Sequence, residues 1–264
     1  MKPSSAGSAK IALCFAVWST WALFSRNIGL PWEALVFSLS FLTAIFSFLW
    51  AFAKGEGVGK PSLALATLGV LLFLNNLAFF YAIEKTTVAN ALFTHYMAPV
   101  LVAIFAPLLI GEKKLRHSFS CLGASLLGLY LLLPPGLSGS DLKGTAAGLF
   151  SAAAYAGMVI MVRKYAISTA SLRIIFWQNL TVTILTAPLA FMADFRVGAG
   201  GAILLVFLGL FHSVAVPLFY LSGIRSVRAQ TAAILGYIEP LGAVFLAALF
   251  LGEKLPPTAW AGCI

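Results

Sequence analysis

The sequence predicts an all-α integral membrane protein, a ten-helix bundle built from two inverted five-helix repeats with the tenth helix cut short. Two observations predict this fold class: an apolar composition with few charges, and a series of membrane-length apolar runs that repeats in the second half. Of the 264 residues, 61% are hydrophobic and only 9% are charged, and the mean hydropathy is +0.99. A soluble domain carries roughly 25% charged residues, so lipid is the expected solvent of this chain.

The net charge of +9 does not indicate a nucleic-acid partner. The basic residues are scattered between apolar runs and form no continuous basic face. Cys14, Cys121 and Cys263 all lie within apolar stretches, at spacings that match no metal or redox motif. We therefore expect no metal, no cofactor and no nucleic acid. The expected partners are the lipid bilayer and a small-molecule substrate, while the oligomeric state is left open.

Nine apolar runs are long enough, or nearly so, to be membrane-spanning helices. A helix needs about 20 apolar residues to cross the hydrocarbon core, and the runs lack the period-two alternation of membrane barrels. A tenth run starts near Thr258 and stops at Ile264, so the tenth helix is expected to be cut short. The nine long runs cover residues 11–29, 33–53, 62–83, 88–110, 117–133, 144–162, 171–193, 202–223 and 229–251.

The distribution of basic residues predicts the orientation. With a cytoplasmic N-terminus, most of the 17 lysines and arginines fall in cytoplasmic segments, as the positive-inside rule requires. We therefore predict a multi-pass protein of the cell inner (plasma) membrane with its N-terminus in the cytoplasm. The segments on the outer side hold the remaining basic residues, which are Arg26, Lys85, Lys143, Arg196 and Lys254.

The second half of the chain repeats the motifs of the first. A Tyr-x-x-Pro motif followed by Gly-Glu-Lys begins at Tyr96 and begins again at Tyr237. Upstream, the segment 18–26 matches the segment 155–163. The repeats are predicted to cover residues 1–137 and 138–264. Because each would hold five helices, an odd number, the second would enter the membrane from the opposite side, as in many secondary transporters.

These motifs resemble the EamA-type carriers of the drug/metabolite transporter superfamily. The resemblance rests on the repeated proline and Gly-Glu-Lys turn, with Trp18-Ser19 and Arg26 on the first helix, and it covers Lys10 to Ile264. It implies export of amino acids or other metabolites. The first-helix residues, with His95-Tyr96 before Pro99, are similar to the branch that exports aromatic amino acids. The second predicted helix departs from many members in lacking an arginine.

Glu239 is the only acidic residue deep within a predicted span. A carboxylate at mid-membrane costs roughly 2.5–3.5 kcal/mol on insertion scales and by default marks function. The neighbouring Pro240 should leave a carbonyl near Gly236 without its helical partner. Two interpretations stay open: Glu239 is a substrate or proton site, or it is a carboxylate that packs between helices.

Further polar and aromatic side chains could line a cavity between the halves. Asn75 and Asn76 lie mid-span on the third helix, and His212 lies at a similar depth on the eighth. Polar side chains within a bilayer face the bundle interior, where they either line a cavity or join helices. No catalytic residue is proposed. The remaining substrate-binding or cavity candidates are Trp18, His95, Tyr96, Trp177, Gln178 and Tyr237.

Together these features predict a secondary transporter that moves small metabolites, above all amino acids or related compounds, outward by alternating access. A channel or facilitative pore is the first alternative, although the sequence holds no repeated filter segment. A membrane-embedded enzyme is the second. The sequence holds no His-Glu-x-x-His, no Gly-x-Ser-x-Gly and no phosphate-binding glycine loop, so no enzyme activity is expected.

Overall fold

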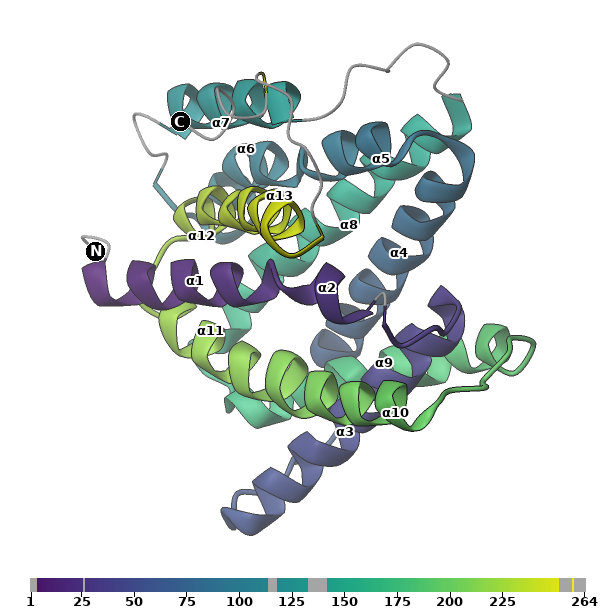
Figure 1. The fold of residues 1–264 in the computed structure, drawn as a ribbon. Coiled ribbons are helices and arrows are strands. Elements are labelled where there is room, and N and C mark those ends of the chain that lie inside the picture. The colour runs from purple at the N-terminus through teal and green to yellow at the C-terminus, as the bar shows by residue number, and fades with distance from the viewer. Residues whose placement is uncertain (1–3, 26, 114–117, 133–141, 252–257, 259–264) are drawn as a thin grey trace.

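The computed structural model describes residues 4–25, 27–113, 118–132, 142–251 and 258, and within these residues every regular element is a helix (Figure 1). Seven of the described helical segments are long and apolar enough to cross a membrane. The predicted all-α membrane fold is therefore confirmed. The predicted boundary between residues 137 and 138, and all but one residue of the predicted tenth helix, lie outside the described residues.

The first half supplies four membrane-length segments and one shorter apolar helix. The first and fourth segments each consist of two helices, whereas the second and third are continuous. In chain order the helices are α1 (Ser5–Trp18), α2 (Trp21–Ser25), α3 (Trp32–Ala53), α4 (Leu63–Lys85), α5 (Val88–His95), α6 (Ala98–Ile110) and α7 (Ser118–Leu132).

The second half begins with two continuous helices and ends with two interrupted segments. Its helices are α8 (Leu142–Ala166), α9 (Ser171–Ala190), α10 (Ala199–Phe207), the π-helix η1 (Leu208–Ala215), α11 (Val216–Ile224), α12 (Ala229–Leu235) and α13 (Ile238–Leu251).

Local sequence explains where several helices begin and end. The side chains of Ser4, Ser62 and Thr87 each accept a hydrogen bond from a backbone N–H in the first turn of the helix that follows. Such caps satisfy donors that have no partner within the helix. At the other end of α6, Gly111 adopts a left-handed conformation with φ of 67°. Glycine tolerates this conformation, so α6 stops there and the chain turns.

Helix contacts occur in pairs that the sequence repeat relates to one another. Helix α4 of the first half packs on α8 of the second, and the equivalent pair is α11 of the second half packed on α1 of the first (Figure 1). Likewise α6 contacts α8, while α12 and α13 contact α1. Two further contacts, α3 with α9 and α6 with α12, join equivalent helices of the two halves. Each half therefore packs against the other through the same helices.

Three of the predicted spans, those over 11–29, 88–110 and 229–251, each consist of two helices separated by a short break. The breaks fall at residues 19–20, 96–97 and 236–237. Pro99 lies in the first turn of α6 and Pro240 in the first turn of α13. Proline suits a first turn, where its missing N–H is not needed. At the first break, the hydroxyls of Ser19 and Thr20 instead donate to carbonyls three residues earlier.

The eighth predicted span also departs from a regular α-helix. Residues Leu208–Ala215 form the π-helix η1, and the N–H of Val216 donates to the carbonyl of Phe211, five residues earlier. Pro217 follows at the start of α11. Segments of π-helix are uncommon and frequently occur at functional sites. Here η1 turns the His212 side chain into the bundle, where it is buried.

Candidate functional site

The breaks of the two repeat-related segments meet in the middle of the bundle. The Tyr237 hydroxyl, at the α12–α13 break, donates to the carbonyl of Tyr96, at the α5–α6 break, over 2.9 Å. The two rings lie 6.2 Å apart between centroids. This contact joins corresponding residues of the two halves and places Glu239, two residues after Tyr237, at their junction.

The Glu239 side chain lies in the first turn of α13 and is half-buried. A helix N-terminus favours a nearby negative charge. Within the described part of the chain, no side chain or backbone group donates a hydrogen bond to its carboxylate. The carboxylate interacts electrostatically with Tyr96 and Tyr155. The expectation that the Gly236 carbonyl lacks a partner is wrong, because this carbonyl accepts a hydrogen bond from the Glu239 N–H at 3.1 Å.

A chain of polar side chains leads from this junction into the first half. Nδ1 of His95 lies 2.8 Å from the Ser151 hydroxyl, which donates to Oδ1 of Asn75 at 3.0 Å. The Asn75 amide in turn donates to Oδ1 of Asn76 at 3.3 Å. The residues come from α5, α8 and α4. We call these four residues, together with Tyr96, Tyr155, Tyr237 and Glu239, the central cluster.

A second polar group surrounds His212 on η1. Its Nε2 lies 3.2 Å from the Thr20 hydroxyl at the first helix break. Trp18 donates its indole N–H to the His212 carbonyl at 3.1 Å and packs against Tyr220, with ring centroids 5.5 Å apart. The repeat relates Trp18 to Tyr155 of the central cluster. We call His212, Thr20, Trp18 and Tyr220 the His212 cluster.

Trp177 and Gln178 make their polar contacts outside both clusters. The Trp177 indole donates to the carbonyl of Val58, in the segment between α3 and α4, at 3.0 Å. The Gln178 amide contacts the sulfur of Met158 on α8 at 3.1 Å. The structure therefore brings eight of the ten candidates into two neighbouring polar groups. Trp177 and Gln178 make their polar contacts elsewhere, although Trp177 packs against the same apolar core as Trp18 and Tyr220. That any of the ten binds a substrate stays a prediction.

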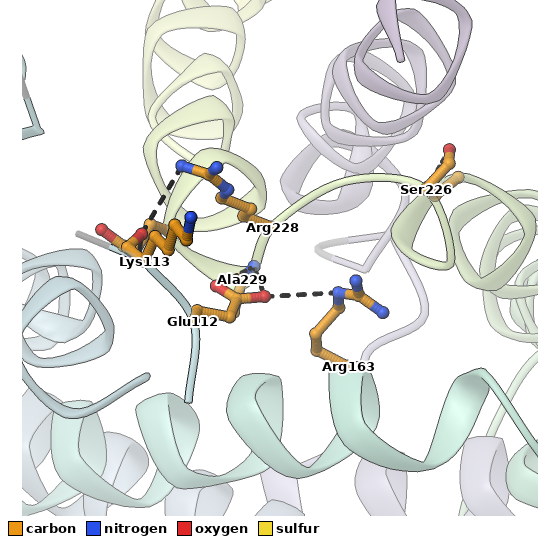
Figure 2. Close-up of polar contacts among 8 residues, drawn as sticks. Glu112, Lys113, Arg163, Ser226, Arg228 and Ala229 are labelled. Atoms are coloured by element: carbon orange, nitrogen blue, oxygen red, sulfur yellow. Dashed lines mark hydrogen bonds and ion pairs between the residues drawn. The ribbon is translucent and has the colours of Figure 1, made fainter. Parts of the chain in front are cut away.

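The Gly111-Glu112-Lys113 turn is a contact between the halves (Figure 2). Both carboxylate oxygens of Glu112 lie 3.0 Å from the N–H of Ala229, the first residue of α12. One oxygen is 3.4 Å from Nε of Arg163, on α8, and the side chains are 10% and 12% exposed. The carbonyl of Lys113 accepts from Arg228 and Gln230. Glu112 thus caps a helix of the other half, and we call this set the Glu112 contact.

Sequence reasoning missed several residues of these groups. Ser151 and Thr20 are small hydroxyl residues that nothing in the local pattern distinguishes from packing residues. Glu112 was part of a recognised motif, but its hydrogen-bond partner Ala229 lies 117 residues further along the chain. For Tyr155 and Arg163 a signal existed. Both fall in the segment 155–163 that repeats 18–26, so the repeat could have marked them as counterparts of Trp18 and Arg26.

Membrane-length helices are broken around a half-buried carboxylate that has no hydrogen-bond partner among the described residues, an arrangement typical of membrane transport proteins. A family comparison agrees: the EamA-like transporter family matches residues 6–133 and again residues 142–264. The chain belongs to the EamA-like transporter family.

Two relatives are named as transporters, one similar over nearly the whole chain and one over about two thirds of it. An uncharacterized transporter of Archaeoglobus fulgidus is 31% identical over 258 residues, covering 97% of this chain and 92% of the relative. The pseudopaline exporter CntI of Pseudomonas aeruginosa is 26% identical over 171 residues, covering 64% of this chain and 60% of the exporter. A solved crystal structure has a TM-score of 0.87 at 19% identity and covers 99% of this chain and 95% of its own, so it has the same fold.

Proposed function

We propose that this transporter moves amino acids or related small metabolites out of the cell by alternating access, with aromatic amino acids the first candidates. One observation carries the proposal. Glu239, at the junction of the two halves, has no hydrogen-bond partner among the described residues and is half-buried. A carboxylate left without a partner at this depth is suited to bind the ammonium group of a cargo or a proton.

The surroundings of Glu239 support an aromatic or amine-bearing cargo. Tyr96 and Tyr155 interact with it electrostatically, and the His95 ring lies 5.4 Å from each tyrosine ring. Aromatic faces attract cations and stack on other rings. The name of the related pseudopaline exporter supports the outward direction.

The proposed orientation places the N-terminus and the Glu112 contact in the cytoplasm. Both lie at the same end of the bundle, because the N–H of Ser4 donates to the carbonyl of Ser226, two residues before Arg228. Cysteines introduced at Ser4 and at Lys113 should therefore react with an impermeant maleimide only from the cytoplasmic side. Labelling of either from outside would reverse the proposed orientation.

Uptake into proteoliposomes tests the transport proposal. Radiolabelled phenylalanine, tyrosine and tryptophan would be screened first, then other amino acids and metabolites. A carrier gives saturable uptake and counterflow against unlabelled cargo, whereas a pore gives flux that does not saturate. Saturable counterflow of at least one amino acid is expected. Flux that rises linearly with concentration, or counterflow only by compounds without an amine, would contradict the proposal.

A further inference from the structure

The central cluster determines which nitrogen of His95 carries the proton. A serine hydroxyl has one proton to donate, and that of Ser151 goes to Oδ1 of Asn75 at 3.0 Å. In the same arrangement the Asn75 amide nitrogen donates to Asn76. The Ser151 oxygen can therefore only accept from His95, whose Nδ1 lies 2.8 Å away. In neutral His95 the proton is on Nδ1.

Nε2 of His95 is then a lone-pair acceptor. It has no hydrogen-bond partner in the described part of the chain, and the side chain is half-buried. The ring lies between Phe79, at 4.8 Å, and Tyr155 and Tyr96, both at 5.4 Å. These two tyrosines are the residues that interact electrostatically with Glu239. The acceptor and the carboxylate therefore belong to the same aromatic surroundings.

His212 is in the opposite state. The Thr20 hydroxyl donates to the carbonyl of Val17 at 2.7 Å, so it accepts from Nε2 of His212 at 3.2 Å. Nδ1 of His212 is buried and has no partner within the described residues. The side chain is only 2% exposed. The two histidines thus carry their protons on different nitrogens. The His95 side chain is half-buried, whereas that of His212 is buried.

We propose that Ser151 and Asn75 are positioning residues that hold His95 with its proton on Nδ1, so that Nε2 accepts a hydrogen bond from an N–H group of the cargo. This proposal rests on the proposed function and narrows it to cargo that carries a protonated amine. An ammonium group has three donors. The Glu239 carboxylate and Nε2 of His95 can each take one, beside the faces of Tyr96 and Tyr155.

Nitrogen NMR of the full-length protein, with ¹⁵N-labelled histidine and at mildly alkaline pH, tests the proton position without any cargo. His95 should show a protonated Nδ1 and an unprotonated Nε2, and His212 the reverse. In Asn75→Leu the Ser151 hydroxyl is released to donate to His95, so the proton should move to Nε2. The matched control Thr20→Val should change His212 and leave His95 as it is. A wild-type His95 with its proton on Nε2 would overturn the assignment.

Phenethylammonium is the probe for the second step, with phenethyl alcohol as its matched control without the charged amine. Phenethylammonium should move the Nε2 resonance of His95 to lower frequency, because that nitrogen becomes a hydrogen-bond acceptor, and should leave His212 unchanged. Ser151→Ala should weaken phenethylammonium binding about tenfold, which corresponds to the loss of one hydrogen bond, with little effect on the alcohol.

The outcomes of the two steps separate the two proposals. An unmoved His95 resonance at saturating probe, or equal weakening of both compounds by Ser151→Ala, would overturn the role of His95. A failed transport screen combined with the expected nitrogen pattern and probe shift would instead contradict the proposed function alone.

Discussion

Two glutamates lie at the N-termini of α12 and α13, the two helices of one broken segment, and they differ in their partners. Glu112, from the first half, caps the first residue of α12 and lies 3.4 Å from Arg163. Glu239 lies in the first turn of α13, and no described residue donates a hydrogen bond to its carboxylate. Both carboxylates gain from a helix N-terminus, but among the described residues only Glu112 has a cation and an N–H directed at it.

The difference separates a group that joins the two halves from a group to which no described residue donates a hydrogen bond. Under the proposed function, the second group binds the cargo or a proton. A carboxylate with fixed partners inside a protein joins the elements that supply them. A carboxylate without partners at membrane depth is costly, so a bound cation or proton would stabilise it. The predictions below test this contrast, starting with the largest expected effect.

Removing the charge of Glu239 should have the largest effect, and that effect should fall on transport. Glu239→Gln keeps the shape of the side chain, so folding should survive. The rate of counterflow should fall at least about tenfold, because a hydrogen bond to a charged group contributes about 1.5–3 kcal/mol. Glu239→Asp, which keeps the charge, is the matched variant and should retain more activity. Equal, unimpaired transport by both variants would leave Glu239 as a packing residue.

Removing the charge of Glu112 should instead reduce stability. Glu112→Gln leaves the half-buried Arg163 without its counter-ion, and breaking a fully buried ion pair costs about 3 kcal/mol, so the loss should approach that value. Thermal unfolding in detergent, followed by intrinsic fluorescence, measures the loss. Glu56→Gln, at an exposed carboxylate between α3 and α4, is the control and should leave the midpoint unchanged. A midpoint for Glu112→Gln equal to that of the control would contradict the role of the Glu112 contact.

Disrupting the close packing of α13 against Ser19, beside the first break, should have the next largest effect on stability. A Cβ on Gly242 of α13 would lie 2.6 Å from Oγ of the buried Ser19. Gly242→Val should therefore force α13 away from α1 and destabilise the protein by about 1–3 kcal/mol, the usual cost of overpacking. Gly123→Val, where an added Cβ meets nothing within 4 Å, is the control. If the two substitutions lower the unfolding midpoint equally, the close approach is not important.

The smallest effect is expected at the exposed pair of Asp194 and Arg196. Hydrogen bonds from the Arg196 side chain, and then from its backbone N–H, lower the pKa of Asp194. The pair therefore stabilises the fold above the pKa of the unfolded chain and loses this contribution as pH falls through the lowered pKa. Solvent screens such pairs strongly. Asp194→Asn should leave transport and the unfolding midpoint unchanged near neutral pH, and a clear loss of either would contradict this.

The positions of the membrane helices could be predicted from the sequence, because lipid imposes a simple length and polarity rule on each one. The breaks at residues 19–20 and 96–97 could not. They depend on hydroxyls that bond carbonyls one turn earlier and on a contact between Tyr96 and Tyr237, which lie 141 residues apart. The prolines indicated where backbone hydrogen bonds would be lost, but tertiary contacts determine whether the helix bends or ends there.

Some residues of the candidate site could also be predicted from the sequence, and others could not. Glu239 stood out because charge is rare within a span, and His95 and Asn75 because polar groups there need partners. Trp177 had the same appearance in the sequence, yet its indole bonds to Val58 in a connecting segment. Ser151 was passed over, although it joins His95 to Asn75. Hydrogen bonds between distant helices are a tertiary property, so a single sequence cannot rank these residues.

The contrast between the two glutamates can be measured directly with a hydrophobic carbodiimide, which modifies carboxyl groups that are accessible from apolar surroundings and lack ion-pair partners. After treatment of the protein in proteoliposomes, mass spectrometry of the peptides gives the modified fraction at each glutamate. Our account predicts modification of Glu239 and protection of Glu112, with phenethylammonium slowing the reaction at Glu239. Modification of Glu112 at an equal or higher level, or an unreactive Glu239, would contradict it.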